Sequence, residues 1–319
     1  EGEQGFNMAR LVGLMAGLPD TVAGVTVNRF CGSSMQAIHM AAGAIQMDAG
    51  EAFVCAGVES MSRVPIMGYN PMPNPALHDR YPQAYMSMGE TAENVAAKYG
   101  LNREEQDAFA AASHDKAAKA QTEGRLAGEI VSIATDNGAV STDGCIRPET
   151  TVETLSGLKP AFDENGMVTA GSSSPLTDGA SAVLVCSEAY AEKANLEPLA
   201  RIKGIATAGC EPEIMGIGPV GSSNKALARA GIGVDDLDVI ELNEAFAAQS
   251  LASIRDLKLD TAKINLDGGA IALGHPLGAT GARITGKAAQ VLKREGGRYA
   301  LASQCIGGGQ GIATVLEAL

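Results

Sequence analysis

Residues 263–309, KINLDGGAIALGHPLGATGARITGKAAQVLKREGGRYALASQCIGGG, determine the expected fold. Their pattern is a short apolar strand, a glycine-rich turn, a helix and a second strand. Residues 25–59, VTVNRFCGSSMQAIHMAAGAIQMDAGEAFVCAGVE, follow the same order, with Val27-Asn28 in the place of Ile264-Asn265. The repetition predicts two similar halves, and alternating strands and helices predict parallel sheets with right-handed crossovers. We therefore expect an α/β protein with a duplicated layered architecture.

Potentially reactive side chains lie in the glycine-rich turns of both halves. Cys31 lies in NRFCGSSMQA, His275 in GHPLGATGAR and Cys305 in CIGGGQG. Cys31 follows an expected strand around Val25 and Val27 and precedes a helical pattern, so backbone dipoles at the helix N-terminus are expected to favour its thiolate. Glycines allow backbone to approach a bound substrate closely. The pattern predicts a covalent active site between the two halves, near strand carboxyl ends.

The segment between the halves differs in composition. Residues 65–85, PIMGYNPMPNPALHDRYPQAY, are rich in proline and asparagine and indicate an irregular excursion. Helices are expected next, one ending at Gly100 and another beginning at Asn102 with a capping-box pattern to Glu105. SSSPLTDGASAVLVCSEAY then returns to the first sheet as a strand. We predict an N-terminal half, an inserted helical domain and a C-terminal half, formed by residues 1–62 with 173–196, by 63–172 and by 197–319.

A further strand, DVIEL at residues 238–242, runs directly into the helical pattern NEAFAAQSLASIRDL. Asn243 and Glu244 thus stand between a strand end and a helix start, where polar side chains can point into a cleft. The alternative role of Asn243 is that of a plain helix N-cap.

Composition excludes several classes of function. The net charge of -13 argues against nucleic acid and anionic membranes as partners, because both select basic surfaces. No apolar run approaches the ~18 residues of a membrane-spanning helix. The 6 cysteines show neither C-x-x-C nor metal-ligand spacing, so we expect no metal and reduced thiols, as in a cytoplasmic protein.

Eight stretches along almost the whole chain resemble, in the same order, motifs of the thiolase family: VTVNRFCGSSMQA, MSMGETAENVA, IRPETT, KPAFDENGMVTAGSSS, MGIGPV, LNEAFAAQ, GGAIALGHPLGATGAR and CIGGGQG. The resemblance implies the family's layered α/β/α/β/α fold, with the inserted helical domain covering coenzyme A. It also implies acyl transfer between CoA and a carbon or sulfur nucleophile. IRPETT and KPAFDENGMVTAG most resemble the degradative branch, which cleaves 3-ketoacyl-CoA in fatty-acid β-oxidation. The alternative is the biosynthetic branch, which forms acetoacetyl-CoA by Claisen condensation.

The resemblance also implies catalytic roles. Cys31 would attack the carbonyl of the acyl thioester and hold the acyl group, while His275 takes the thiol proton. Cys305 would serve as the second acid and base, protonating the departing acetyl-CoA carbanion. His275 and a water held by Asn243 would form one oxyanion site, and the backbone N–H groups of Cys31 and Gly307 the other.

Binding residues follow from the same resemblance. CoA is expected as a substrate and not as a permanent cofactor. Because CoA is polyanionic and the protein acidic, a local basic patch must hold it, for which Arg147 and Lys159 are candidates. Arg147 would lie near the adenine and Met88 at the acyl pocket, and the residues expected along the pantetheine channel are Ser174, Phe162, Leu176, Ala245 and Phe246. Ser87 stands where some thiolases have histidine, which leaves the acyl-chain preference open.

Partners are implied as well. The resemblance implies a homodimer or a dimer of dimers, and association with a multifunctional hydratase/dehydrogenase of β-oxidation. It further implies that family members carry some tens of residues, including a strand and a helix, ahead of the point where this sequence begins. A chain truly lacking that strand is expected to have a gap in its N-terminal sheet.

Three other functions fit part of the pattern. A decarboxylating ketoacyl synthase shares the layered fold and a Cys/His site but would carry a second histidine in the place of Cys305. A cysteine hydrolase could use Cys31, His275 and Asn243, yet it needs no second thiol. A non-catalytic CoA-binding remnant is the third alternative.

Overall fold

The computed structural model describes residues 6–66 and 68–319 and has the layered α/β architecture that the sequence predicts. Residues 1–5 and 67, which belong to the expected N-terminal half and inserted domain, lie outside the described part. Two helices, α2 (Ser33–Gln46) and α11 (Leu277–Glu295), form the central layer. A sheet packs on each side of them; the first consists of β1 (Ala52–Glu59) and β4 (Gly179–Cys186).

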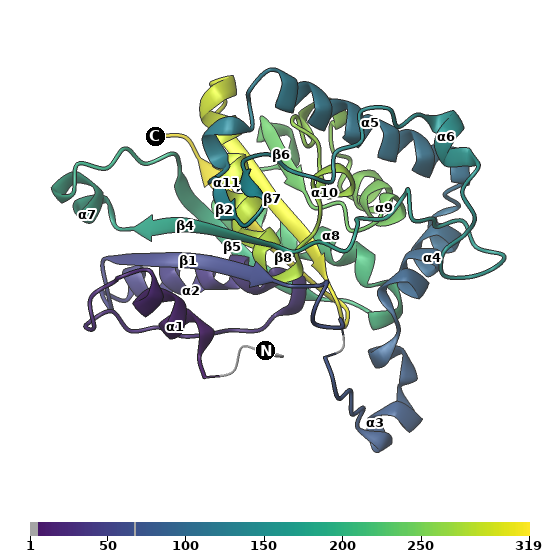
Figure 1. Cartoon of the computed structure of the whole chain (residues 1–319), viewed down its shortest axis with the longest axis horizontal. Helices are drawn as coiled ribbons and strands as arrows, with labels where there is room; N and C mark the ends of the chain where they lie inside the picture. The colour runs from purple at the N-terminus through teal and green to yellow at the C-terminus, as the bar shows by residue number, and fades with distance from the viewer. Residues whose placement is uncertain (1–5, 67) are drawn as a thin grey trace.

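The second sheet has the strand order β5-β8-β7-β6, formed by Arg201–Gly209, Gln310–Glu317, Tyr299–Ile306 and Val239–Leu242 respectively. β6 and β7 are parallel, because the chain between them crosses over through helices. β7 and β8 are antiparallel, because only the glycine turn 307–309 joins them, with φ of 76° at Gly308 and 79° at Gly309. Figure 1 shows the β1–β4 pair crossing β7 and β8. The expectation of parallel sheets is correct for β6–β7 and wrong for β1–β4, β7–β8 and β5–β8, which are antiparallel.

The expected strand around Val25 and Val27 is not formed. Residues 23–29 belong to no strand, and no described strand pairs with them. These residues are instead held by the loop and helix before them: Asn7 Nδ2 donates to the Gly24 carbonyl at 2.7 Å, and the Ala9 N–H donates to the Thr26 side-chain Oγ1 at 3.0 Å. An apolar segment forms a strand only where a neighbouring strand pairs with its backbone N–H and C=O groups.

A large apolar hollow lies beside the first sheet. It is bordered by residues 22–28, α2, β1, β4 and α1 (Met8–Met15). Apolar side chains exposed on its walls include Val25, Val54, Val58 and Leu184. The first sheet is thus much less covered than the second.

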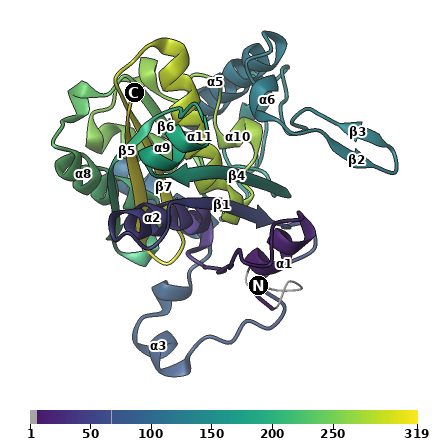
Figure 2. The same ribbon diagram turned by 90° about the vertical axis from the view of Figure 1, so that its left-hand side faces the viewer.

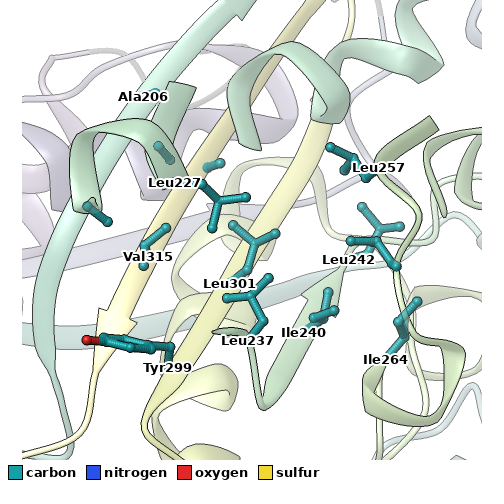
Figure 3. Close-up of a cluster of buried hydrophobic side chains, with 14 of the residues drawn as sticks. Ala206, Leu227, Leu237, Ile240, Leu242, Leu257, Ile264, Tyr299, Leu301 and Val315 are labelled. Atoms are coloured by element: carbon teal, nitrogen blue, oxygen red, sulfur yellow. The ribbon is translucent and has the colours of Figure 1, made fainter. Parts of the chain in front are cut away.

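Apolar side chains bury the second sheet on both faces. On its outer face, Leu301 and Val315 pack against Leu227 of α8 (Gly218–Ala230) and Leu257 of α9 (Ala247–Leu257), as Figure 3 shows. On its inner face, α2 and α11 contribute a second cluster with Met35, Ile284 and Leu292. Burial on both sides explains why β6 and β7 are mostly apolar, with Glu241, Ser303 and Gln304 as their polar residues.

The two central helices touch backbone to backbone. A Cβ atom on Gly281 would lie 2.3 Å from the Met35 nitrogen, so only glycine allows this approach. The Ala282 N–H donates to Ser34 Oγ at 2.8 Å across the same contact. The turn that carries Cys31 and the turn that carries His275 are therefore brought side by side.

Residues 63–172 contain most of the remaining helices, which are α3 (Pro75–Arg80), α4 (Met88–Tyr99), α5 (Arg103–Thr122) and α6 (Val152–Ser156). Gly100 caps α4 with φ of 60°, and Asn102 with Glu105 forms the capping box of α5, as predicted. A hairpin of β2 (Ile133–Thr135) and β3 (Gly138–Val140) projects from the body, as does α3 (Figure 2).

The other described elements are short: α7 (Glu188–Lys193), α10 (Ala270–Leu273), and the 3-10 turns η1 (Phe30–Gly32), η2 (Pro82–Tyr85), η3 (Ala127–Glu129), η4 (Pro212–Ile217), η5 (Val234–Asp236) and η6 (Thr261–Lys263). Within residues 6–66 and 68–319, no helix combines the length and apolar character needed to cross a bilayer.

Replacement of Gly281 tests the central contact. Gly281→Ala is expected to lower the free energy of unfolding by about 1–3 kcal/mol, because the methyl group would overlap Met35 backbone. Gly43→Ala is the matched control on α2: its Cβ meets nothing within 4 Å, so stability should rise by about 0.5–1 kcal/mol. Urea unfolding measures both. Equal effects of the two substitutions would contradict the proposed packing constraint.

Candidate active site

Cys31 lies in the turn η1, directly before α2, and is 6% exposed. The preceding residue, Phe30, has a left-handed φ of 46°, which is uncommon for a bulky side chain. Neighbouring hydrogen bonds hold this conformation: the Phe30 N–H donates to Asn28 Oδ1 at 2.8 Å, and Ser33 Oγ donates to the Phe30 carbonyl at 2.7 Å. The chain thus fixes Cys31 in a strained turn at the start of a helix.

The end of β7 supports Cys31 from the other half of the chain. The backbone N–H groups of Gly307 and of Cys31 itself lower the pKa of the Cys31 thiol. Gln304 Nε2 donates to the Cys31 carbonyl, which anchors the turn to β7. Gln304 was not among the residues predicted from the sequence, where its position next to Cys305 was the available signal.

Burial dominates the ionisation of this thiol. Desolvation raises the pKa of Cys31 to about 11, although the two N–H groups lower it; Glu59 adds a smaller increase. The expectation that the helix terminus makes Cys31 a thiolate is therefore wrong for the free protein. A buried charge loses more hydration than the helix dipole and two hydrogen bonds return.

His275 follows α10 and is buried at 4% exposure. Its N–H donates to Thr177 Oγ1 at 3.1 Å, which fixes the backbone. Its ring Nδ1 lies 2.7 Å from Thr280 Oγ1, and that hydroxyl donates to the Pro276 carbonyl at 3.0 Å. When the hydroxyl donates to Pro276, it accepts from Nδ1–H, and this tautomer leaves the Nε2 lone pair free as a base.

The imidazole is neutral over the physiological range. Burial, with a smaller contribution from the charge of Arg283, lowers the pKa of His275 to about 3. Neutral imidazole and neutral thiol can exchange a proton only when the developing charges are stabilised together. Nucleophile activation is thus tied to the presence of substrate.

Asn243 stands directly after β6 and contacts His275. Its Nδ2 lies 3.4 Å from Nε2 and 3.5 Å from Nδ1, so the amide lies beside the ring and not end-on to one nitrogen. Its Oδ1 is buried without a hydrogen-bond partner among the described residues. The alternative role of helix N-cap is wrong, because α9 begins at Ala247 with Phe246 as its N-cap.

Cys305 lies near the end of β7 and is fully buried. Desolvation, followed by the charge of Cys31, raises the pKa of Cys305 well above its usual value. The two thiols are therefore close enough to influence each other. Buried apolar neighbours around Cys305 include Ala245 and Phe246, with Met88 at the edge.

The inserted helices contribute the cover of this site. A Cβ atom on Gly307 would lie 3.3 Å from Met88 Sδ, which places the start of α4 over the β7–β8 turn. The rings of Phe162 and Phe246 meet edge to face with centroids 5.9 Å apart. The Ser174 N–H donates to the Ala245 carbonyl at 3.0 Å.

Three of the expected CoA-binding residues lie farther out. Leu176 is 70% exposed, and Arg147 and Lys159 are also exposed. The Arg147 N–H donates to His114 Nδ1 at 3.2 Å, which fixes its backbone and leaves the guanidinium outside. No contact in the described part of the chain joins these three residues to either active-site cysteine.

Both halves of the chain match models of known protein families. The model described as "Thiolase, N-terminal domain" matches residues 1–189, and "Thiolase, C-terminal domain" matches residues 196–318. The chain belongs to the thiolase family. A relative from Shewanella frigidimarina named 3-ketoacyl-CoA thiolase is 54% identical over 324 residues, covering 99% of this chain and 84% of that protein.

Further thiolases match the chain over almost its whole length. The 3-ketoacyl-CoA thiolase of Bacillus subtilis is 47% identical over 330 residues, again covering 99% of this chain and 84% of that protein. The crystal structure of human mitochondrial 3-ketoacyl-CoA thiolase in complex with CoA matches with a TM-score of 0.91 and 42% identity. It covers 100% of this chain and 84% of that chain. The resemblance seen in the motifs thus extends to the whole described fold.

The pKa of Cys31 has a measurable consequence. Alkylation of Cys31 by iodoacetamide should accelerate about tenfold per pH unit from pH 7 to 10, because only the thiolate reacts and its pKa is about 11. No step near pH 6–7 is expected from His275, whose pKa is about 3. Mass spectrometry of the Cys31 peptide gives the rate. A rate that is constant between pH 6 and 9 would instead indicate a preformed thiolate–imidazolium pair.

The Thr280 hydroxyl can be tested by an isosteric change. Thr280→Val removes the acceptor for the Nδ1 proton and should lower kcat about 10–100-fold, because His275 can then adopt the wrong tautomer. Thr280→Ser keeps the hydroxyl and should retain activity within about threefold. Steady-state kinetics on both variants measure the difference, and equal kcat values would contradict the tautomer assignment.

Proposed function

We propose that this thiolase-family chain catalyses CoA-dependent thiolysis of 3-ketoacyl-CoA in fatty-acid β-oxidation. The products are acetyl-CoA and an acyl-CoA shorter by the acetyl unit. The observation that carries the proposal is the pair of buried thiols, Cys31 and Cys305. The hydrogen bond from Gln304 Nε2 to the Cys31 carbonyl brings Cys31 to the end of β7 that carries Cys305. The names of the relatives at 47% and 54% identity support the substrate class.

In the first half-reaction, the Cys31 thiol gives its proton to His275 Nε2 and the sulfur attacks the 3-keto carbonyl. The carbon–carbon bond then breaks, and its electron pair leaves as the enolate of acetyl-CoA. Cys305 protonates that carbon and becomes a thiolate. In the second half-reaction, Cys305 takes the CoA thiol proton, CoA sulfur attacks the acyl-Cys31 thioester, and Cys31 regains its proton from His275.

A second thiol is needed because Cys31 is occupied by the acyl group when the carbon acid must be protonated. A cysteine hydrolase has no step that uses Cys305. A ketoacyl synthase would carry a second histidine at position 305, where this chain has a cysteine. The geometry therefore favours thiolysis over both alternatives.

Negative charge on oxygen develops in both half-reactions, and fixed donors would stabilise it. We assign one oxyanion site to the N–H groups of Cys31 and Gly307, which favour negative charge on the Cys31 sulfur. We assign the other to His275 and a water held by the unpaired Asn243 Oδ1. Loss of one such donor typically costs about 3 kcal/mol of transition-state stabilisation.

CoA would enter as a substrate beneath residues 63–172. We propose that Met88 borders the acyl pocket, that Arg147 and Lys159 meet the nucleotide, and that the pantetheine channel is lined by Ser174, Phe162, Leu176, Ala245 and Phe246. The edge-to-face pair Phe162–Phe246 supports this path, because it joins the outer cover to the cluster around Cys305. We also propose that the chain is divided into an N-terminal half, an inserted domain and a C-terminal half, formed by residues 1–62 with 173–196, by 63–172 and by 197–319.

We further propose a cytoplasmic homodimer or dimer of dimers that associates with a hydratase/dehydrogenase of β-oxidation. The six free cysteines support a reducing compartment. Exposed Val54, Val58 and Leu184 on the first sheet support burial against another surface.

Thiolysis assays test the function. With a long-chain 3-ketoacyl-CoA and CoA, the wild type should turn over, and Cys31→Ala and Cys305→Ala should each lose at least about a thousandfold in kcat. Cys186→Ala is the control, since Cys186 is partly exposed at the end of β4. Thiolysis by Cys31→Ala at the wild-type rate would refute the covalent scheme. Activity confined to acetoacetyl-CoA would favour the biosynthetic branch.

A further inference from the structure

Glu244 adjoins Asn243 but does not point into the cleft. It is 2% exposed, and its carboxylate is surrounded by hydrogen-bond donors from three separate parts of the chain. Oε2 accepts from Ser113 Oγ at 2.6 Å and from the Ile271 N–H at 3.2 Å, and Oε1 accepts from Asn265 Nδ2 at 2.7 Å. The described contacts give this carboxylate no salt-bridge partner.

Each donor belongs to an element that carries or covers the active site. Ile271 lies in α10, which ends two residues before His275. Ser113 lies on α5 of the inserted helices, and its Oγ also accepts from the Gly269 N–H at 3.1 Å. Asn265 is bonded to both backbone groups of Leu242, at 3.0 and 2.9 Å, which closes the network onto the end of β6.

The Glu244 carboxylate is tightly packed against the neighbouring backbone. A Cβ atom on Gly269 would lie 2.0 Å from Glu244 Cδ, so the carboxylate rests directly on the backbone that begins α10. The α10 turn is short and closed by the Gly274 N–H bonded to the Ala270 carbonyl at 2.9 Å. A shift of Glu244 would therefore be passed to the His275 turn.

We propose that Glu244 is a positioning residue, whose carboxylate fixes the His275 turn relative to Asn243 and links both to α5. The effect is geometric: Arg283 is the charge that lowers the pKa of His275. The inference rests on the proposed function for its kinetic consequence, whereas its effect on the His275 ring can be measured without substrate.

Glu244→Gln is the decisive substitution. It keeps the size of the side chain, but a glutamine presents one NH₂ group where the native carboxylate presents two acceptors. In one orientation the NH₂ faces Asn265 Nδ2, and in the other it faces the Ile271 N–H. Either orientation breaks at least one bond of the network.

Glu241→Gln is the matched control. Glu241 lies on β6 three residues earlier, is equally buried, and its Oε1 has no hydrogen-bond partner among the described residues. The same change of a buried carboxyl to an amide is therefore made outside the Glu244 network.

Kinetics and the state of the His275 ring are measured together on both variants. Glu244→Gln should lower kcat about 10–100-fold with KM changed less than about threefold, because a displaced His275 affects the chemical step. The ring ¹⁵N resonances of His275, recorded without substrate, should shift, because the displaced turn no longer holds Nδ1 against Thr280. Glu241→Gln should keep kcat within about twofold and leave the ring resonances unchanged.

Ser113→Ala keeps the proposal testable if Glu244→Gln folds poorly. It removes one donor to Glu244 and should lower kcat and shift the His275 ring resonances in the same direction, and in the double variant the two losses of kcat should not add. Thermal unfolding is recorded for every variant.

Two results would overturn the inference: wild-type kcat and His275 resonances in Glu244→Gln, whether or not Tm falls, or equal changes in Glu241→Gln. A wild type without thiolysis would instead refute the proposed function, and the His275 resonances would still decide the role of Glu244.

Discussion

The backbone contact between α2 and α11 is the constraint on which the rest of the structure depends. Gly281 lets the two helices approach until Met35 backbone lies against it, and Ser34 accepts the Ala282 N–H across the contact. Because one helix starts after Cys31 and the other after His275, this approach brings the two halves' reactive turns together. The β7–β8 turn then adds Cys305 and Gly307 from the sheet beneath.

Burial sets the chemistry of the site that this contact creates. It holds Cys31 as a thiol and His275 as a neutral imidazole, so the free protein carries no thiolate–imidazolium pair. In the proposed mechanism, the cost of charging either group is offset only when the substrate supplies an electrophile and its oxygen meets fixed N–H donors. The positions of Cys31 and His275 therefore matter more than their ionisation in the free protein. Hydrogen bonds of Thr280, Gln304 and Glu244 lie around both residues.

Much of this arrangement could be predicted from local sequence patterns. The caps at Gly100 and Asn102, the strand after residue 238, and the return of residues 179–186 to β1 all followed from capping residues and apolar periodicity. The prediction of a strand at Val25 and Val27 was wrong, because a segment forms a strand only beside another strand, and the local sequence does not show whether one is there. The prediction of a thiolate at Cys31 was wrong for a similar reason, because the burial of its sulfur depends on residues that are distant in the sequence.

By itself, the sequence carried the motifs of the thiolase family, and the layered fold and the candidate residues Cys31, His275 and Cys305 followed from that resemblance. Turns and helix caps could also be predicted, because glycines and cap residues act through local chemistry. Only the tertiary structure decided that Glu244 points inward, that Thr280 contacts His275 Nδ1, and that Gln304 holds the Cys31 turn. These facts depend on which side chains meet across the two halves, and hydrogen bonds between residues far apart in the chain leave no local periodicity from which they could be inferred.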